Sequence, residues 1–294
     1  MTSSVSGPTL DIRDLSLGFK SHRGTAQVLH GISLTVGRGE RVALVGESGS
    51  GKSVTARIVL GLLQSLHSAR ISGEARFQGR DVNTMTEKDR RELRGTDISM
   101  IFQDPTSALN PVFTIGEQFH EVLKRRDARI SRAKANARAT EALAEVSIHD
   151  PARVLSSYAF QLSGGMNQRV MIAMALAKTP ALLLADEPGT ALDVTVQDQT
   201  LRLMRDLVAR HETSVLFISH NLGVVREFAD RVYVIYRGRI VESGPVAAVF
   251  ETAGHPYTRA LMAAVPRITG GGIPEIEEAP AGFADAAVHH GGQA

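Results

Sequence analysis

The feature that most constrains how this chain folds is a glycine-rich stretch, GESGSGKS, at residues 46–53. It follows the apolar run RVALV and opens a segment, residues 52–66, whose apolar side chains recur at helical spacing. A strand, a loop of the form G-x-x-x-x-G-K-[ST] and a helix together form a cradle in which backbone N–H groups surround a phosphate and the lysine adds positive charge. The hydroxyl that ends the motif can bind Mg²⁺, which makes Ser53 a predicted metal ligand. The predicted phosphate-binding loop comprises Gly46, Glu47, Ser48, Gly49, Ser50, Gly51, Lys52 and Ser53.

Short apolar runs alternate with longer helical patterns along the rest of the chain, which predicts an α/β fold with a largely parallel sheet covered by helices. The candidate strands are residues 41–46, 97–102, 181–186, 214–219 and 231–236. Their nearly continuous hydrophobicity indicates burial on both faces. Residues 10–19, 32–36 and 72–79 instead alternate apolar and polar side chains, which favours an antiparallel sheet with one face in water.

Two segments depart from this pattern. From residue 115 to about 147 the sequence is helical and heavily charged, which indicates an inserted helical subdomain. From about residue 269 it is rich in Gly, Pro, Ala and Glu without periodicity, and we expect residues 269–294 to be a disordered tail. His289 and His290 lie in that tail, where no partner ligands are apparent, so they are expected to be disordered with it.

Composition excludes several chemistries. The 294 residues contain no cysteine, which rules out disulfides, thiolate catalysis, an iron-sulfur cluster and cysteine-ligated zinc. No apolar run approaches the roughly 18 residues that cross a bilayer, and the N-terminal residues lack the pattern of a secretory signal. Any membrane role is therefore expected to be peripheral and through a partner. The net charge of +2 demands neither nucleic acid nor anionic lipid.

Two further motifs carry candidate chemistry. In ALLLADEP a buried strand ends in two carboxylates at the edge of the sheet where ligands bind in open α/β folds. Asp186 is a candidate Mg²⁺ ligand and Glu187 a candidate to orient or activate an attacking water, although a charged turn before Pro188 is the alternative. In LSGGMNQRV the residues Ser163, Gly164 and Gly165 precede a helix as a phosphate loop would, but no lysine follows them.

The ordered series GESGSGKS, FQDP, LSGGMNQR, LLLADEP, ALD and ISHN resembles the ATP-binding subunit of an ABC transporter, over residues 10 to about 267. The resemblance implies a P-loop NTPase (RecA-like) core of parallel strands with an N-terminal antiparallel β-subdomain. It also implies an ABC ATPase domain over residues 1–268, with a helical subdomain at about 104–165 and a C-terminal extension at about 244–268.

The family resemblance assigns a role to four further residues. Phe19 matches the aromatic side chain that stacks on adenine, and its alternative is a core phenylalanine. Gln103 matches the catalytic glutamine that touches Mg²⁺ and the attacking water. His220 matches the catalytic histidine that contacts the γ-phosphate of ATP. Asp193 matches a nucleotide-site residue and also suits the N-cap of the following helix.

The resemblance further implies an assembly. Two ATP-binding subunits, identical or related, would pair head to tail around two ATP molecules, so that Ser163, Gly164 and Gly165 of one meet the γ-phosphate held by the loop of the other. Two integral-membrane permease subunits and, through them, an extracytoplasmic solute-binding protein are the other expected partners. The expected location is the cytoplasmic face of the cell membrane. No nucleic acid is expected, because the basic run at residues 124–138 lacks interleaved aromatics and indicates a solvated helix face.

Three stretches point to one branch of the family. FQDPTSALNP, LSGGMNQRV with Met166 in place of the usual glutamine, and GHPYTRALMAAVPR at residues 254–267 are similar to importers of the oligopeptide, dipeptide and nickel group. The expected function is therefore ATP hydrolysis coupled to import of oligopeptides or dipeptides. A nickel or opine-type cargo is an alternative, as is a soluble ABC ATPase without a transport role.

Overall fold

The computed structural model describes residues 7–22, 24–189, 193–263 and 287–290. The chain divides into two compact units, one formed by residues 1–87 and 216–294 and the other by residues 88–215. Among the described residues, none of the helices combines the length and the hydrophobicity that crossing a membrane requires.

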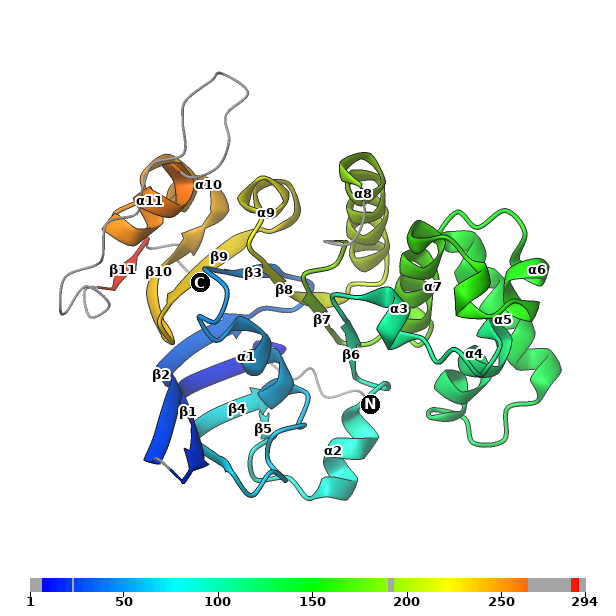
Figure 1. The fold of residues 1–294 in the computed structure, drawn as a ribbon, viewed down its shortest axis with the longest axis horizontal. Helices are drawn as coiled ribbons and strands as arrows, with labels where there is room; N and C mark the ends of the chain where they lie inside the picture. The colour runs from blue at the N-terminus through cyan, green and yellow to red at the C-terminus, as the bar shows by residue number, and fades with distance from the viewer. Residues whose placement is uncertain (1–6, 23, 190–192, 264–286, 291–294) are drawn as a thin grey trace. The chain divides into compact units, whose positions relative to one another are not determined.

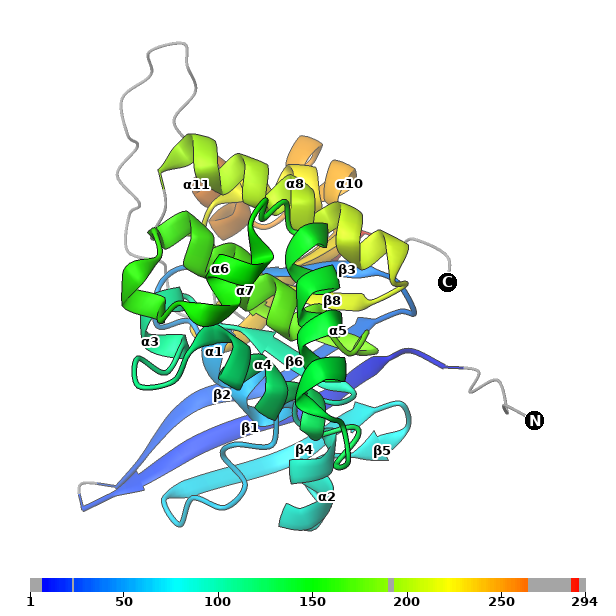
Figure 2. The ribbon, with the colours of Figure 1, turned by 90° about the vertical axis from the view of Figure 1, so that its right-hand side faces the viewer.

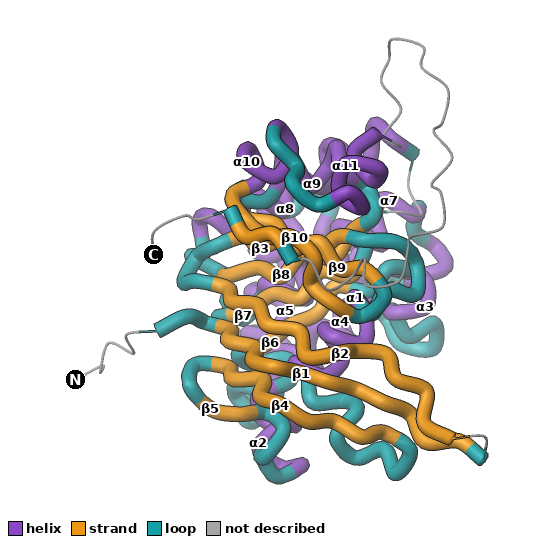
Figure 3. Tube along the Cα trace, turned by 90° about the vertical axis from the view of Figure 1, so that its left-hand side faces the viewer, coloured by secondary structure: helices purple, strands orange, loops and turns teal. Residues whose placement is uncertain are grey.

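The N-terminal part of the first unit is an antiparallel sheet in the order β2-β1-β4-β5, whose strands run side by side in Figure 3. Its strands are β1 (Leu10–Ser21), β2 (Gly24–Val36), β4 (Ala69–Phe77) and β5 (Arg80–Asp81). The central strand β1 alternates buried and more exposed side chains along much of its length, as the polar and apolar alternation predicts. The alternation shifts where the register of β1 with its neighbours is irregular, after Ile12.

A second sheet contributes the order β11-β10-β9-β3-β8 to the first unit. Its strands are β3 (Arg41–Val45), β8 (Ser214–Ser219), β9 (Arg231–Tyr236), β10 (Arg239–Pro245) and β11 (Val288–His289). β3 and β9 are parallel, whereas β10 runs antiparallel to β9. The predicted strands 41–46, 214–219 and 231–236 are therefore confirmed to within a residue.

The helices of the first unit are α1 (Lys52–Val59), α9 (Leu222–Phe228), α10 (Val246–Glu251) and α11 (Pro256–Ala263). Figure 1 shows α10, in orange, beside β10. The prediction of one helix over residues 52–66 is wrong beyond Val59. Gly61 adopts a left-handed φ of 70° there, its N–H donates to Ile58 O, and the N–H of Leu62 donates to Arg57 O. These two bonds are the C-terminal capping motif that glycine favours, and they end the helix.

The second unit contains the parallel strands β6 (Ile98–Ile101) and β7 (Leu182–Asp186), which pair with each other. Both lie within the predicted strands 97–102 and 181–186. Residues 182–185 have no measurable solvent exposure, in agreement with the expected burial on both faces. Each buried leucine of this run contributes about 2 kcal/mol to folding.

Helices make up the rest of the second unit. They are α2 (Glu87–Leu93), α3 (Pro105–Ala108), α4 (Ile115–Lys124), α5 (Arg132–Glu145), α6 (Pro151–Ser156), the short 3-10 helix η1 (Ala159–Gln161), α7 (Gly164–Leu176) and α8 (Val194–Arg210). Figure 2 shows α4, α5, α6 and α7 packed as one group, in green. The helical and charged pattern from residue 115 thus forms helices, and side-chain caps at Thr114 and Ser131 begin two of them.

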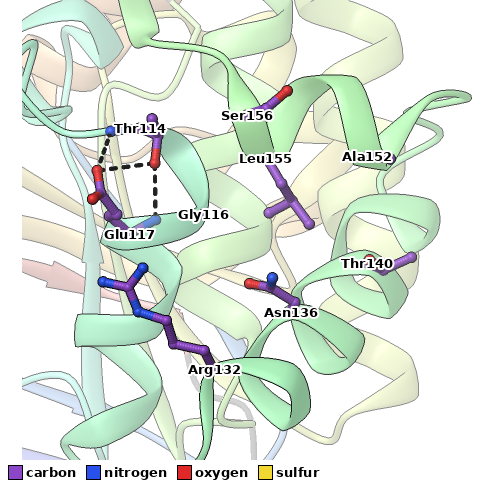
Figure 4. A pocket seen from close by; sticks show the side chains of 9 residues that line it. All are labelled: Thr114, Gly116, Glu117, Arg132, Asn136, Thr140, Ala152, Leu155 and Ser156. Atoms are coloured by element: carbon purple, nitrogen blue, oxygen red, sulfur yellow. Dashed lines mark hydrogen bonds between the residues drawn. The ribbon is translucent and has the colours of Figure 1, made fainter.

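A hollow of about 390 Å³ lies between α4, α5 and α6 (Figure 4). Gly116 lets α4 and α6 approach closely there, because a Cβ at this position would lie 2.9 Å from Leu155 O. The carboxylate in the hollow, that of Glu117, accepts hydrogen bonds from the backbone N–H and from the hydroxyl of Thr114. These bonds, the backbone bond most of all, lower the pKa of Glu117. The hollow is therefore explained by helix packing and capping.

The C-terminal residues differ from the expected disordered tail. Val288 and His289 form β11, parallel to Glu242 and Ser243 of β10, and the N–H of His290 donates to Ser243 O at 2.8 Å. The prediction for His289 and His290 is wrong because the edge of β10 supplies backbone partners to an extended segment, which no pattern within the tail itself indicates. The other residues of the predicted tail, 269–286 and 291–294, lie outside the described residues, and residue 287 is described without regular secondary structure.

Candidate functional site

The predicted phosphate loop connects β3 to α1 in the first unit, and its geometry requires glycine at two positions. Gly46 has a φ of 155°, and a Cβ there would lie 2.1 Å from the carbonyl oxygen of Ile235. Gly51 has a φ of 109°, and a Cβ there would lie 2.5 Å from Leu29 Cδ2. Only a residue without a side chain fits these points, so the two glycines fix the path of the loop.

The side chains of the loop present donors to its interior. Lys52 is 6% exposed, and its Nζ lies 2.7 Å from the carbonyl oxygens of Gly46 and of Glu47. The Oγ of Ser50 is buried and forms no hydrogen bond with the part of the chain that the structure describes. The first turn of α1 carries no acidic side chain. A buried ammonium, an unpartnered hydroxyl and the positive end of a helix fit a phosphate group.

Tyr257 of α11 supports this loop from outside it. The backbone N–H of Glu47 donates to Tyr257 Oη at 3.0 Å, and the ring of Tyr257 lies 4.3 Å from that of Tyr236. Tyr257 is 2% exposed, and burial raises the pKa of its phenol to about 12. The sequence stretch HPYT indicated the branch of the family but gave no sign of this contact, because the two residues are 210 positions apart.

Glu242 of β10 fixes the start of α11. Its carboxylate is fully buried and accepts hydrogen bonds from the N–H of Gly254 at 2.8 Å and of His255 at 3.1 Å. His290 Nε2 lies 2.6 Å from the same carboxylate. Burial alone would raise the pKa of Glu242, but the side chain of Thr258, then that of His290 and the two backbone N–H groups, leave that pKa below its ordinary value. In the sequence, the only sign of this role of Glu242 was a charged residue within the apolar strand pattern RIVESG.

In the second unit the structure brings together two of the predicted catalytic residues. Gln103 follows β6 and Glu187 follows β7, and Ile101 pairs with Ala185 at the end of these parallel strands. Gln103 Nε2 donates to Glu187 Oε2 at 3.0 Å. The pair therefore stands at the carboxyl edge of the two strands, where ligands bind in open α/β sheets.

Asp186 and Glu187 differ sharply in their surroundings. Asp186 is the last residue of β7 and only 7% exposed, whereas Glu187 is half-buried. Glu187 has a φ of 48°, a left-handed conformation that is uncommon for a residue with a side chain. Such backbone strain concentrates at functional sites, because the surrounding structure must hold it in place.

Ser163, Gly164 and Gly165 of the LSGGMNQRV stretch, called the signature below, lie at the exposed start of α7. Ser163 is the N-cap of this helix, and its Oγ accepts a hydrogen bond from the N–H of Met166 at 3.3 Å. Ser163 and Gly164 are exposed and Gly165 is half-buried. This helix start presents N–H groups to the surroundings of the subunit, an arrangement that attracts an anion.

The other predicted residues occupy the ends of strands and helices. Asp193 is confirmed as the N-cap of α8, where its Oδ1 accepts from the N–H of Val196 at 3.0 Å. His220 is exposed and directly follows β8. Phe19 is half-buried on β1, where its backbone pairs with Ala26 and with Ala69.

The candidate residues are divided between the two units. The phosphate loop, Phe19 and His220 belong to the first unit, and Gln103, Ser163, Gly164, Gly165, Asp186, Glu187 and Asp193 belong to the second. The hydroxyl of Ser53, the side-chain amide oxygen of Gln103 and the carboxylate of Asp186 are oxygen donors of the kind Mg²⁺ prefers. In the described part of the chain no group of three or more His, Cys, Asp or Glu side chains could hold a metal by itself.

Comparison with known proteins identifies the class to which this fold and these motifs belong. The family model described as ABC transporter matches residues 29–190. A solved structure titled "Dimeric structure of a post-hydrolysis state of the ATP-binding cassette MJ0796 bound to ADP and Pi" is similar, with a TM-score of 0.71 and 26% identity over 81% of this chain and 98% of that one. The chain belongs to the ABC transporter family, which confirms the predicted family and fold class.

The C-terminal region and several similar relatives show to which branch of the family the chain belongs. The model described as oligopeptide/dipeptide transporter, C-terminal region, matches residues 241–288. The oligopeptide transport ATP-binding protein OppD of Bacillus subtilis is 45% identical over 92% of this chain and 75% of its own length. The probable peptide ABC transporter ATP-binding protein y4tR of Sinorhizobium fredii is 49% identical over 92% of this chain and 81% of its own length.

A third relative is longer. The peptidoglycan transport ATP-binding protein YejF of Agrobacterium fabrum is 50% identical over 91% of this chain, and the match spans 49% of YejF. The chain thus covers about half of that relative. These similarities place the chain in the oligopeptide/dipeptide branch of the family, as its motifs predict.

Proposed function

We propose that this protein binds and hydrolyses ATP to power the import of oligopeptides or dipeptides through an ABC transporter. The observation that carries the proposal is the hydrogen bond of 3.0 Å between Gln103 and Glu187 beside Asp186. The second unit thus carries water-positioning and metal-binding groups together at the end of two buried strands, and the phosphate loop of the first unit supplies the groups that bind the phosphates. The relatives named for oligopeptide, peptide and peptidoglycan transport support a cargo that contains peptide bonds.

The proposed roles follow the geometry of each unit. The loop N–H groups and Lys52 bind the phosphates, and His220 contacts the γ-phosphate. Phe19 stacks on adenine, and Asp193 lies at the nucleotide site. Bound Mg²⁺, with Ser53, Gln103 and Asp186 as its protein ligands, supplies charge neutralisation at the phosphates.

Glu187 has the central catalytic role in this proposal. Its carboxylate accepts a hydrogen bond from Gln103 and orients the attacking water, whose proton it receives. The positive φ of Glu187 directs the backbone away from the line of β7. Gln103 holds the carboxylate in place, so the water is positioned before the reaction begins.

The proposed assembly contains a second ATP-binding subunit. The exposed start of α7, with Ser163, Gly164 and Gly165, would meet the γ-phosphate held by the loop of the other subunit. The similar solved structure of the ATP-binding cassette MJ0796 is a dimer bound to ADP and Pi, which supports this arrangement.

Membrane partners complete the proposal. Large apolar side chains are exposed in the helical part of the second unit: Val112 at 74%, Phe113 at 49% and Phe160 at 69%. Exposed apolar groups of this kind mark a docking surface, here for two permease subunits at the cytoplasmic face of the membrane. An extracytoplasmic solute-binding protein would deliver the peptide to these permeases.

The substitution Glu187→Gln tests the catalytic assignment. The amide cannot accept the proton of the attacking water, so hydrolysis should fall by on the order of a hundredfold or more. ATP binding should persist, because the loop and Lys52 are unchanged. The control is Glu141→Gln, an equal change on the exposed face of α5. ATP turnover near that of the wild type in Glu187→Gln would refute the assignment.

The cargo needs a separate experiment on the whole transporter. The complex would be reconstituted in vesicles with its permease subunits and its solute-binding protein, and ATP hydrolysis would be followed as dipeptides, oligopeptides, nickel or an opine are added. Stimulation and uptake with peptides alone support the proposal. Stimulation by nickel or the opine alone would replace the peptide cargo and leave the ATPase assignment intact.

A further inference from the structure

A second pocket, with a volume of about 480 Å³, lies in the second unit and is lined mainly by cations. Three parts of the unit contribute to it: the C-terminal part of α2 with the turn that follows, the end of α4, and the loop between α7 and β7. The lining residues are Arg91, Arg94, Gly95, Glu121, Val122, Arg125 and Lys178. This volume lies within the range of small-molecule sites.

Lys178 is the buried cation of this basic pocket. The residue is only 5% exposed, and its Nζ forms no hydrogen bond within the described parts of the chain. The amine reaches the turn after α2, because a Cβ placed on Gly95 would lie 3.8 Å from it. A buried ammonium without a partner is costly, and the cost is removed when an anion binds to it.

The backbone around Lys178 is held firmly. Its carbonyl oxygen accepts a hydrogen bond of 2.8 Å from the guanidinium of Arg126, and the N–H of Thr179 donates to Leu176 O at 2.8 Å. The hydroxyl of Thr213 also donates to Pro180 O at 2.9 Å. Because the turn is held on both sides, the fold fixes the position of Lys178 in the wall of the pocket.

The charges that face Lys178 are predominantly positive. Burial, together with the charges of Arg125 and Arg126, lowers the pKa of Lys178 to about 8, against a smaller opposite effect of Asp97. The only carboxylate in the lining belongs to Glu121, whose side chain is 72% exposed and lies 3.5 Å from Lys124 Nζ. Arg91 and Arg94 add two guanidinium groups from α2 and the turn after it.

We infer that this basic pocket, built by Arg91, Arg94, Arg125 and Lys178, binds the phosphate group of a small phosphorylated molecule. A phosphate can accept hydrogen bonds from several guanidinium groups and from the ammonium at once, and its double charge matches the excess of cations. The recess around Lys178 suits a soluble molecule that can enter it. A phosphorylated lipid headgroup offers the same chemistry, and the experiments below separate the two sources.

The first experiment measures pyrophosphate binding by calorimetry in the background Lys52→Ala, which weakens binding at the nucleotide loop. In this background the basic pocket should bind pyrophosphate. Lys178→Met removes the ammonium and should weaken that binding by about tenfold or more. The matched control is Lys134→Met, an exposed lysine on α5. Equal pyrophosphate affinity in the Lys178→Met and Lys134→Met proteins would overturn the inference.

A second variant tests the pocket in case Lys178→Met does not fold. Arg125 is exposed, so Arg125→Ala should leave the fold intact while it removes one of the cations of the pocket. In the Lys52→Ala background it should also weaken pyrophosphate binding by several-fold, because one charged hydrogen-bond donor is lost. Unchanged binding in Arg125→Ala would contradict the proposed pocket even if Lys178→Met were unfolded.

Two further measurements define the ligand. Sulfate, whose charge is constant between neutral and alkaline pH, should bind more weakly above about pH 8 in the Lys52→Ala protein, and this loss should disappear with Lys178→Met. A pH dependence that is the same in both proteins would count against the inference.

Binding to vesicles of phosphatidylcholine, with and without phosphatidic acid, tests whether the ligand is a phosphorylated lipid headgroup. Binding to the acidic vesicles that depends on Lys178, without pyrophosphate binding, would overturn the assignment to a small soluble molecule.

Discussion

At the scale of single residues, the two deeply buried lysines of this chain show how environment separates one role from another. Lys52 is 6% exposed and finds two carbonyl oxygens at 2.7 Å within its own loop. Lys178 is 5% exposed, and its amine has no hydrogen-bond partner in the described residues. Lys52 belongs to a motif that the sequence reveals directly. Lys178 belongs to none, and only the fold places it beside Arg125.

The unpartnered amine predicts a specific dependence of stability on pH. The pKa of Lys178 is about 8 in the folded protein, against an ordinary value of 10.5. Between these values the unfolded chain binds more protons than the folded chain, so this group makes stability rise as the pH increases from about 8 to about 10.5. Below that window the folded protein carries the buried charge, at a cost of at most about 3 kcal/mol.

Urea unfolding of the wild type and of Lys178→Met measures this effect. Lys178→Met should be the more stable protein at about pH 7, and its advantage should shrink toward about pH 10. Lys134→Met, with its exposed lysine, should show no such change. A stability gap between the wild type and Lys178→Met that stays constant with pH would contradict the lowered pKa.

At the scale of structural elements, α11 connects the C-terminal region to the nucleotide loop. His255, Tyr257 and Thr258 of the HPYT stretch are each at most 2% exposed, and Glu242 holds the start of the helix through two backbone N–H groups. Tyr257 then reaches the loop through the N–H of Glu47. The stretch that characterises this branch of the family therefore has a structural function in the first unit.

The substitution Tyr257→Phe tests this connection. It removes the acceptor of the Glu47 N–H and should weaken ATP binding about fivefold, since such a hydrogen bond contributes about 1 kcal/mol. The matched control is Tyr233→Phe, which removes the acceptor of the Thr35 N–H at 3.2 Å. Calorimetric titration with an ATP analogue should show the loss in Tyr257→Phe only. Equal affinity in both variants would mean that the loop keeps its geometry without α11.

Local patterns predicted most of the elements, because the signal for each lies within a few neighbouring residues. The apolar runs gave β3, β7, β8 and β9 nearly to the residue, and the glycine and lysine spacing gave the loop before α1. The length of α1 was overestimated, because the prediction did not take account of Gly61, which ends the helix with a φ of 70°. A glycine inside an apolar pattern is tolerated in many helices, so its left-handed φ is evident only in the structure.

Contacts across long sequence distances were the part that could not be predicted. Tyr257 and Glu47 are 210 residues apart, and His290 and Glu242 are 48 apart. Each pair depends on which strands become neighbours, and that order is a property of the whole sheet. The hydrogen bond between Gln103 and Glu187 was not predicted either, although the two residues were each assigned to the attacking water and both follow predicted strands.

At the scale of the whole molecule, the candidate residues are divided between the two compact units. The phosphate loop and the signature residues belong to different compact units, and Ser163 and Gly164 face outward at the start of α7. The proposed function places the γ-phosphate of one subunit against the signature of another. A single copy of the chain is then expected to be a poor ATPase.

Complementation between two defective variants tests this assembly. Ser163→Arg should abolish ATP hydrolysis without weakening ATP binding to the isolated subunit, because the loop is intact. Lys52→Ala should abolish hydrolysis through the loop while it keeps its signature. Mixing the two should restore activity, because one composite site would combine the loop of the first variant with the signature of the second. Activity of the mixture that only equals the sum of the two alone would exclude the shared site.

The two-residue strand β11 has a consequence for the solubility of the protein. It covers the side of β10 that is not paired with β9, at Glu242 and Ser243, and His290 extends the cover through its bond to Ser243 O. Uncovered strand edges are templates for the strands of other molecules and lead to aggregation. A chain shortened before residue 288 would expose these backbone groups, so we expect it to self-associate more readily than the full chain.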